Sequence, residues 1–330
     1  MNISHHHRIG RRHLLLMGAS MAASTFAPWA HADTWPTQAI RLVVPYPAGG
    51  INDVVARMFA DGLSQSLGQS FVVENKPGAG GTIGMADLAK ANDQHSFAFA
   101  AISPLTLNPY LMKVGYRPLE DITPVASVMY APVYALATTA FAGKSFADVL
   151  AQAKTAKGVT VATSGYGTLA HIMVEQLGRA TGGNFVHVPY KGGSQLVTDA
   201  AGAQFDLLLA NPFGPINALI DQGKLRVLAT TGPQRATSYP SVATLGELGF
   251  DKANHTSLFG FYAPASTHPA AVAQFHAAVN QLLQSPEMQQ RLRKLDNVPY
   301  ASTQDGFASA VRKDYALNGL VIEQAGIKAE

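Results

Sequence analysis

The sequence contains no cysteine, few charged residues and no basic tract, and each of these absences excludes a class of protein. Without cysteine, the 330 residues offer no disulfide, no thiolate metal site and no cysteine nucleophile. Charged residues make up only 14% of the chain and hydrophobic residues 47%, a composition typical of a globular protein and not of a disordered one. The length allows two domains.

The formal charge of +3 comes entirely from the first 32 residues. Arg8, Arg11 and Arg12 lie in this segment, which holds no aspartate or glutamate. Removing it takes the number of Lys and Arg from 24 to 21, against 21 Asp and Glu, so the rest of the chain is neutral. A neutral chain without a basic tract argues against nucleic acid as a partner.

Residues 1–32 have the pattern of an export signal. A positively charged start precedes an apolar, small-residue stretch from Leu14 to Ala30, and Ala30-His31-Ala32 matches an A-x-A cleavage site. Arg11-Arg12 also fits a twin-arginine signal loosely. The apolar stretch is short and contains Pro28, which disfavours an uncleaved membrane anchor. We therefore expect a cleavable signal peptide and a periplasmic protein, by either the twin-arginine or the general secretory route.

The most informative stretch of the remaining chain is a strand, a glycine-rich turn and a helix. Ile40 to Val44 is a short apolar run that predicts a buried strand, and helical spacing of apolar residues begins at Asp53. Between them lies Pro45-Tyr-Pro-Ala-Gly-Gly50. Backbone N–H groups at a helix N-terminus lack partners and carry partial positive charge, so this turn predicts an anion site. The alternative to an anion site is an ordinary βα turn. Asn52 or Asp53 is the expected helix cap.

A second unit of this kind follows about 30 residues later. Ser70 to Glu74 predicts a strand, and it leads into the glycine-rich segment 75–84. The segment does not fit the dinucleotide-binding fingerprint, because Ile83 stands where glycine is needed, and no Gly-Lys-Ser/Thr of a P-loop is present. It predicts a backbone cradle for a small anion that does not depend on a side-chain cation.

The rest of the chain alternates strands and helices, which predicts an α/β fold with largely parallel sheets. Segment 134–254 repeats the plan of the first, with glycine-rich turns at Ser164–Thr168 and Pro189–Gly193. Two lobes with facing turns predict a cleft for a small ligand. We also expect a short helix over Thr244–Leu248.

Support for catalysis is weak, because the sequence has no Gly-x-Ser-x-Gly and no His-Glu-x-x-His. His171 follows a glycine-rich turn and either faces the cleft or packs in the core, whereas His187 is expected to be structural. Tyr190 and Lys191 could orient a ligand, although Lys191 could equally be solvated. Asp206 stands on an apolar strand, where it either binds the amine of an amino-acid ligand or accepts hydrogen bonds from neighbouring N–H groups.

Three motifs together carry a resemblance to a known family. They are Pro45–Asp53, Glu74–Gly81 and Val188–Gly193, and the similarity extends over essentially all of the chain after residue 32. The chain resembles the substrate-binding proteins of tripartite tricarboxylate transporters, the Bug or TctC-type receptors. The resemblance implies a type II periplasmic-binding-protein fold, with lobe 1 at 33–133 plus 255–330, lobe 2 at 134–254 and a ligand cleft between them.

The resemblance also implies a periplasmic solute receptor, not an enzyme, that binds a small organic carboxylate for uptake by a transporter complex or for sensing. No catalytic residue, cofactor or metal is expected. The implied ligand-binding positions are Tyr46, Ala48, Gly49, Gly50, Gly80, Gly81, Thr82, Ser103, Tyr166, Thr168, His171, Tyr190 and Asp206. The chain departs from the family pattern at 92–96 and by one extra residue in 202–206, which leaves the orientation of Asp206 open.

The alternative is an exported hydrolase that uses His171 with Asp206. It would need a nucleophile such as Ser164 or Thr168, and no recognised spacing supports one. Aliphatic di- and tricarboxylates, acidic amino acids and aromatic acids all suit a cradle of amides, so several ligand classes stay open, as does the oligomeric state.

Overall fold

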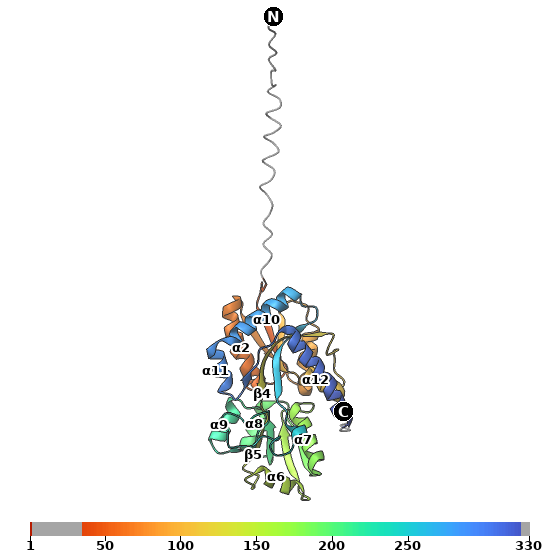
Figure 1. The fold of residues 1–330 in the computed structure, drawn as a ribbon, viewed down its shortest axis with the longest axis vertical. Coiled ribbons are helices and arrows are strands. Elements are labelled where there is room, and N and C mark those ends of the chain that lie inside the picture. Colours follow the sequence, from red (N-terminus) through yellow and green to blue (C-terminus); the bar gives the residue numbers. More distant parts are fainter. Residues whose placement is uncertain (2–34, 325–330) are drawn as a thin grey trace.

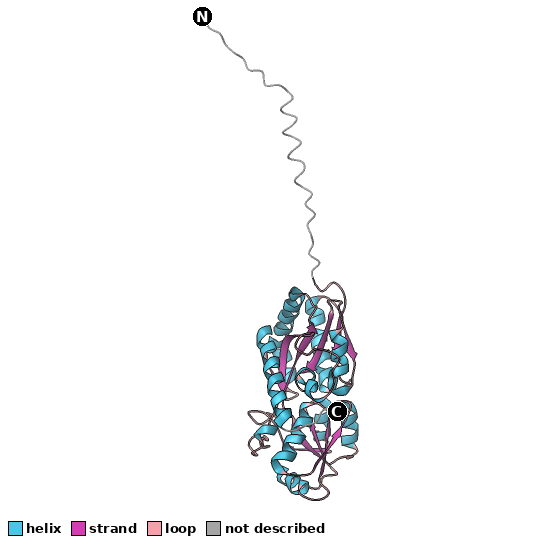
Figure 2. Cartoon of the chain, turned by 90° about the vertical axis from the view of Figure 1, so that its right-hand side faces the viewer, coloured by secondary structure: helices cyan, strands magenta, loops and turns pink. Residues whose placement is uncertain are grey.

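A computed structural model describes Met1 and residues 35–324, which form two α/β lobes, one above the other (Figure 1). The predicted signal peptide lies, apart from Met1, outside the described residues. In both lobes helices flank a central sheet, as Figure 2 shows from the side. The α/β prediction with two lobes is confirmed, but the prediction of largely parallel sheets is wrong, because both sheets also contain antiparallel pairs. Within residues 35–324, no helix is long and apolar enough to cross a membrane.

Lobe 1 is built on a six-stranded sheet in the order β11-β4-β10-β3-β1-β2. Strand β1 runs parallel to β2 and β3, and β10 runs antiparallel to β3 and β4. Its strands are β1 (Ile40–Val44), β2 (Phe71–Asn75), β3 (Ser96–Ala101), β4 (Ile122–Ala131), β10 (Ser257–Pro264) and β11 (Val298–Pro299). Its helices are α2 (Ile51–Leu67), the 3-10 helix η1 (Ala79–Gly81), α3 (Thr82–Ala89), α4 (Ser103–Thr106), α5 (Asn108–Leu111), α10 (Pro269–Gln284), α11 (Pro286–Arg293) and α12 (Gln304–Gln324).

Lobe 2 is built on a five-stranded sheet in the order β7-β6-β8-β5-β9. Strands β7, β6 and β8 are parallel, and β5 is antiparallel to its two neighbours. Its strands are β5 (Tyr134–Thr138), β6 (Val159–Thr163), β7 (Phe185–Pro189), β8 (Leu207–Ala210) and β9 (Leu225–Ala229). Its helices are α6 (Phe146–Ala153), α7 (Leu169–Thr181), α8 (Gly193–Ala201), α9 (Gly214–Asp221) and the 3-10 helix η2 (Asp251–Ala253).

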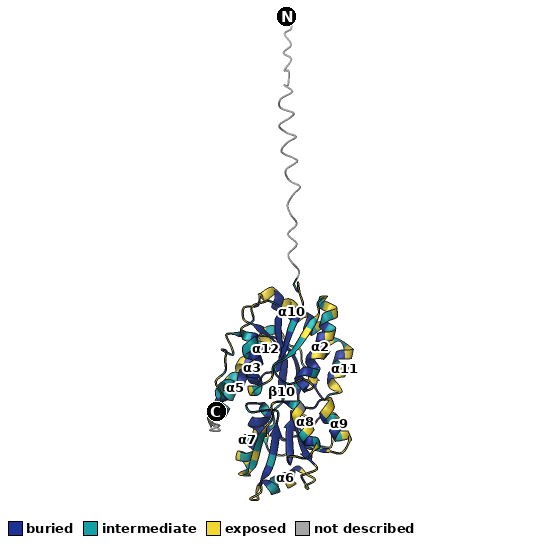
Figure 3. Cartoon of the chain, turned by 180° about the vertical axis from the view of Figure 1, so that it is seen from behind, coloured by how far each residue is buried: buried dark blue, intermediate teal, exposed yellow. Residues whose placement is uncertain are grey.

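Buried residues concentrate along the central strands of both lobes (Figure 3). All eight residues of β10 are buried, as expected for a strand covered on both faces. In lobe 1 the ring of Phe97 stacks on that of Phe275 from α10, with 3.9 Å between centroids. Burial of such aromatic side chains contributes a large share of the hydrophobic stabilisation and fixes α10 on the sheet that positions the cleft.

A buried carboxylate joins the two lobes near the crossover from β4 to β5. The side chain of Asp296, in lobe 1, accepts hydrogen bonds from the hydroxyl of Tyr134 at 2.6 Å and the hydroxyl of Ser238 at 2.7 Å, both in lobe 2. The N–H of Ser238 donates a further bond at 3.2 Å. Asp296 has a left-handed backbone with φ of 54°. We call this group the Asp296 latch.

The short helix predicted over Thr244–Leu248 is wrong, because this segment forms turns. Thr244 pairs with Thr230 in an isolated parallel bridge, and the carboxylate of Glu247 accepts the N–H of Thr244 at 2.8 Å. The side chain of Thr244 in turn accepts the N–H of Glu247. The capping bonds of a helix start are therefore present, but Gly249, with φ of 86°, ends the turn before a helix can continue.

Candidate ligand-binding site

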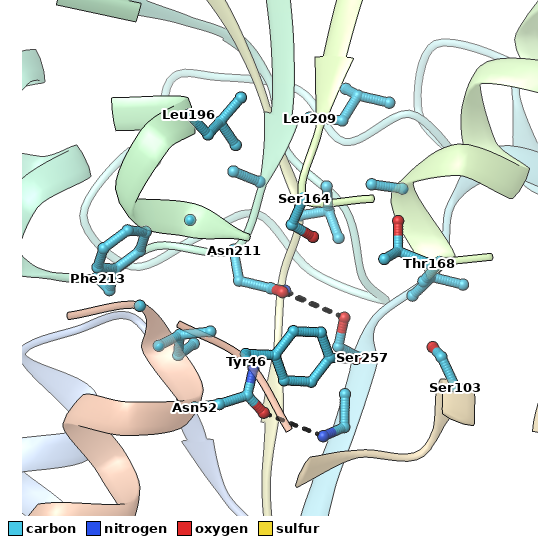
Figure 4. Close-up of a pocket in the computed structure, with 18 of the residues that line it drawn as sticks. Tyr46, Asn52, Ser103, Ser164, Thr168, Leu196, Leu209, Asn211, Phe213 and Ser257 are labelled. Atoms are coloured by element: carbon cyan, nitrogen blue, oxygen red, sulfur yellow. Dashed lines mark hydrogen bonds between the residues drawn. The ribbon is translucent and has the colours of Figure 1, made fainter. Parts of the chain in front are cut away.

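A cavity of about 60 Å³ lies between the lobes, where the loops that follow the central strands meet (Figure 4). Its described lining contains no Lys, Arg, Asp, Glu or His. The lining residues are Tyr46, Gly50, Ile51, Asn52, Ala101, Ser103, Val133, Ser164, Thr168, Leu169, Ala170, Gly193, Leu196, Leu209, Ala210, Asn211, Phe213, Ser257 and Phe259.

Four helices present their N-termini to this cavity. Gly50, Thr168 and Phe213 are the N-cap residues of α2, α7 and α9, and Gly193 is the first residue of α8. The first N–H groups of a helix have no partner inside the helix and mark the positive end of its dipole. The electrostatic field in the cavity therefore comes from backbone dipoles of both lobes and favours an anion.

Polar side chains follow the ends of three buried strands. Ser103 lies after β3, Ser164 after β6 and Asn211 after β8. The hydroxyls of Ser103 and Ser164 make no hydrogen bond to any described residue, so they can bind a ligand. Asn52 accepts the N–H of Ala101 at 3.2 Å through its side-chain oxygen, which leaves its amide nitrogen as a further donor.

Asn211 connects the cavity to both crossovers between the lobes. Its side-chain nitrogen donates to the carbonyl of Pro132 at 2.9 Å, in the first crossover, and to the hydroxyl of Ser257 at 3.1 Å, at the end of the second. Figure 4 shows the contact with Ser257 beside the ring of Tyr46. One half-buried amide in the cavity lining therefore holds the two connecting strands together.

A second cavity of about 200 Å³ adjoins the first on the other side of Tyr46. It is lined by Tyr46, Ala79–Gly81, Ser164–Tyr166 and Pro189–Lys191. The hydroxyl of Tyr46 donates to the carbonyl of Gly80 at 3.1 Å, and burial raises the pKa of Tyr46, which keeps the phenol neutral. Lys191 is the only charged residue in the described lining of either cavity.

Glycines allow the lobes to touch around both cavities. A Cβ atom at Gly80 of lobe 1, where φ is 61°, would lie 2.6 Å from the carbonyl oxygen of Tyr166 in lobe 2. A Cβ atom at Gly192 of lobe 2 would lie 2.2 Å from Cδ of Pro47 in lobe 1. Contacts under 3.0 Å force a shift, so only glycine fits where the predicted glycine-rich turns meet.

The sequence profile of the "Tripartite tricarboxylate transporter family receptor", TctC, matches residues 55–327. The chain belongs to this receptor family. BugT of Bordetella pertussis is 32% identical over 321 residues, covering 96% of this chain and 98% of BugT. Family membership makes the chain a solute receptor and not an enzyme, as the motifs predicted.

Solved structures of TctC and Bug proteins share its two-lobed fold. The structure of the periplasmic binding protein BugD has a TM-score of 0.83 at 28% identity, covering 90% of this chain and 100% of that chain. The R. palustris protein Rpa4515, solved with adipate, gives 0.84 at 28% identity with the same coverage. MatC from Rhodopseudomonas palustris, with bound malate, gives 0.80 at 25% identity, covering 87% and 100%. The predicted periplasmic-binding-protein fold is confirmed.

Eight of the predicted TctC site residues line the two cavities and five do not. Tyr46, Gly50, Ser103 and Thr168 line the first cavity, and Tyr46, Gly80, Gly81, Tyr166 and Tyr190 line the second. The five outside both linings are Ala48, Gly49, Thr82, His171 and Asp206. Thr82 is buried and donates its hydroxyl to the carbonyl of Ala79 at 3.0 Å, within its own loop.

Gly49 lies outside the linings because its N–H binds a carboxylate of the receptor itself. Asp53 accepts this N–H at 2.9 Å, and it also accepts from Arg57 at 3.0 Å and from Asn75 at 2.9 Å. Burial alone would raise the pKa of Asp53, but these hydrogen bonds hold it below its ordinary value. Helix α2 begins at Ile51, so neither Asn52 nor Asp53 is the N-cap, and Asp53 instead reaches back from the third helical position.

Asp206 lies at the opposite end of its strand from the cavity. Its carboxylate accepts the N–H of Thr160 at 3.0 Å and the hydroxyl of Thr160 at 2.9 Å, and Lys157 lies 3.8 Å away. Of the two roles left open by the sequence, bonding to neighbouring donors is the one observed. Asp206 and His171 make no hydrogen bond to each other, because each is bonded to its own neighbours. The pair that the hydrolase alternative requires is therefore not formed.

His171 packs behind the loop that lines the second cavity. Its ring stacks on His187, with 4.3 Å between centroids, and contacts Tyr166 at 4.4 Å. Its Nδ1 accepts the N–H of Gly167 at 3.3 Å. Burial and the neighbouring His187 lower the pKa of His171 to about 4, and burial lowers the pKa of His187 to about 4. Both imidazoles are therefore neutral at pH 7 and support Tyr166 by packing.

Acidification should destabilise the receptor through this histidine pair. Because each folded-state pKa lies below the unfolded value of about 6.5, the unfolded chain binds more protons as the pH falls from 6.5 to 4. We expect the unfolding free energy to fall by on the order of 2 kcal/mol per imidazole over that range. His187→Gln, which retains hydrogen-bonding groups, should make the decline in urea-unfolding free energy shallower. An unchanged pH slope in this variant would contradict the assignment.

The sequence reasoning missed Asn52, Asn211 and Ser257 as residues of the TctC cavity, and considered Ser164 only as a nucleophile. A signal for two of them is present: Ser164 and Asn211 are the first polar residues after buried parallel strands, and such positions face the ligand in α/β folds. Ser257 ends the second crossover, a position that only the lobe arrangement identifies.

Proposed function

We propose that this receptor binds a small organic carboxylate between its lobes and delivers it to a tripartite tricarboxylate transporter complex in the membrane. The observation that carries the proposal is the convergence of four helix N-termini on a cavity whose described lining has no charged side chain. Such a site binds an anion through amides. The adipate and malate bound by two similar proteins support the same class of ligand.

In this proposal one carboxylate lies at the N-terminus of α2. The first amides of the helix, from Gly50 onward, and the side-chain nitrogen of Asn52 would donate to it from lobe 1. Ser164 and the first turn of α7 would bind from lobe 2. The body of a longer acid would extend past Tyr46 toward the second cavity, where the remaining predicted residues lie.

We also propose that the lobe boundaries fall as the sequence predicts, at 133–134 and 254–255. The six-stranded sheet ends with β4 at Ala131 and resumes with β10 at Ser257, whereas β5 begins the other sheet at Tyr134. The crossovers tied by Asn211 would then be the hinge strands on which the lobes close.

We further propose that residues 1–32 are removed during export to the periplasm, and that a sensor protein is the partner if no transporter is present. Similar solved structures are of periplasmic proteins. N-terminal sequencing of the receptor recovered from a periplasmic extract tests the cleavage, and Asp33 is the expected first residue.

The test of ligand class is a thermal-shift screen of carboxylic acids, each beside its amide. A ligand at a hundredfold excess over its dissociation constant adds about 2.7 kcal/mol of stability, which raises the melting temperature measurably. One or more acids should stabilise the receptor while the matching amides do not. Stabilisation by neutral compounds alone would refute the carboxylate proposal.

Ser164→Ala should weaken binding of the stabilising acid by about tenfold, because the variant removes a ligand hydrogen bond of roughly 1–1.5 kcal/mol. The unfolding free energy should not change, since the hydroxyl makes no bond to a described residue. Isothermal titration measures the affinity. Ser241→Ala, at an exposed position of the same lobe, is the matched control and should bind like the unaltered receptor.

A further inference from the structure

A third cavity, of about 640 Å³, lies outside the site described above, between lobe 2 and the C-terminal helix of lobe 1. Its volume falls in the range of about 300–1,000 Å³ that small-molecule pockets occupy. Helix α7 contributes Gln176, Arg179 and Ala180, helix α12 contributes Val321, and the segment around η2 contributes Gly249–Ala253 and His255. We call it the α7–α12 cavity.

Two cations line this cavity, and neither is neutralised. Arg179 and Lys252 make no ion pair or side-chain hydrogen bond with any described residue. Asp251 is the one acidic residue of the described lining. Its Oδ1 lies beside Gly246, 3.4 Å from where the Cβ of a substituted residue would be. Arg179 lies in the last turn of α7, where the negative end of the helix dipole favours a cation. This does not explain why Lys252 lines the same cavity.

A buried amide supplies a further donor. Gln176 is only 8% exposed, and its Oε1 lies 3.2 Å from Nε2 of His255. Because an amide oxygen only accepts, the imidazole is the donor in this bond. The side-chain nitrogen of Gln176 has no partner among the described residues and is not one of the fully buried unpartnered atoms, so it is open to the cavity. It is a further donor beside the two cations.

The rest of the lining is apolar. Phe250 packs on Phe146 at 5.8 Å between ring centroids and forms one wall, and Ala180, Ala253 and Val321 complete the apolar surface. A lining that combines these donors with apolar residues matches a molecule with an anionic head and an apolar body. We propose that the α7–α12 cavity is a second binding site, for a small organic anion with an apolar body.

This site is connected to the interlobe cavity by a single helix. The first turn of α7, at Leu169 and Ala170, lines the interlobe cavity, and Arg179 lies about 15 Å further along the helix axis. The walls of the α7–α12 cavity come from both lobes, so its shape changes when the lobes move apart. Occupation of one site therefore alters the affinity of the other, and the effect is reciprocal.

Para-bromobenzoate is a suitable probe, because its carboxylate and ring match the two sides of the cavity and its bromine can be located by anomalous diffraction. Crystals of the receptor soaked with it should show bromine between α7, η2 and α12. Titration should give an affinity at least about tenfold weaker for the double variant Arg179→Gln/Lys252→Gln. Ala180→Trp, which fills the cavity from an exposed position, should remove the bromine peak.

The matched control is Arg312→Gln/Lys313→Gln, an exposed cation pair on α12 outside the lining, which should bind as the unaltered receptor does. The neutral para-bromobenzyl alcohol should bind much more weakly. Bromine found only in the interlobe cavities, unchanged affinity in the Arg179/Lys252 variant, or equal binding of the alcohol would each overturn the proposal. Binding between the lobes is followed separately through Ser164→Ala, so failure here leaves the receptor function untouched.

Discussion

Gly80→Ala should weaken ligand binding by about a hundredfold. The new Cβ would lie 2.6 Å from the carbonyl oxygen of Tyr166, a backbone atom of the opposite lobe that cannot rotate away. The lobes could then no longer meet around the ligand, and only contacts from one lobe would remain. Loss of about 2.7 kcal/mol of binding free energy corresponds to that factor. Titration with the stabilising acid gives the affinity, and small-angle scattering should show a receptor that stays extended in its presence.

Gly68→Ala is the matched control for this prediction. Gly68 has φ of 68°, close to the 61° of Gly80, and a Cβ there would meet nothing within 4 Å. Both variants carry the left-handed backbone strain of about 1–2 kcal/mol. Only Gly80→Ala adds contacts, one with Tyr166 of the other lobe and one at 2.7 Å from Nδ2 of Asn108 in its own lobe, which can rotate. Equal loss of affinity in the two variants would show that strain, and not closure, is responsible.

Asp296→Ala should lower the unfolding free energy by about 2–4 kcal/mol. The change leaves the buried hydroxyl of Tyr134 without its acceptor, at a cost of about 1–3 kcal/mol, whereas the two donors of exposed Ser238 turn to water. Alanine also tolerates the left-handed backbone poorly. Urea unfolding with a two-state fit measures the change.

Two further variants separate the parts of the Asp296 latch. Asp296→Gly removes the carboxylate but relieves the backbone, so it should be more stable than Asp296→Ala by about 1 kcal/mol. Asp296→Asn retains an acceptor and a residue that adopts this backbone, and it should cost least of the three. If all three variants stayed within 0.5 kcal/mol of the unaltered receptor, roughly the range of inert surface changes, the latch would contribute nothing to stability.

The sequence was most informative where structure is decided locally. The apolar run Ile40–Val44 and the glycine turn after it predicted both the strand and the N-terminus that faces the cavity. The start of α2 was placed two residues late, because aspartate is favoured both as a cap and in the first turn, and spacing alone does not separate the two. Only the structure shows that Asp53 binds the N–H of Gly49.

The sequence predicts no helix at α9, where the pair Gly214-Pro215 is typical of a turn. In the structure the proline occupies the first turn, where its missing N–H costs nothing, and the helix begins there. The role of Asp206 was left open for a different reason. Its place at the start of a strand already puts it far from the carboxyl end where ligands bind, but that argument needs the strand direction in the sheet.

The interlobe cavity attracts an anion with backbone dipoles instead of charged side chains. This determines how ligand affinity responds to the medium around the receptor. The one titratable side chain in the described lining, the phenol of Tyr46, is held neutral by burial, which raises its pKa. The site therefore keeps the same charge across the pH range in which the receptor is stable, so affinity follows only the ionisation of the acid, whose pKa is about 4. Backbone dipoles also do not titrate. The receptor should therefore report the concentration of its acid faithfully in media that differ in alkalinity.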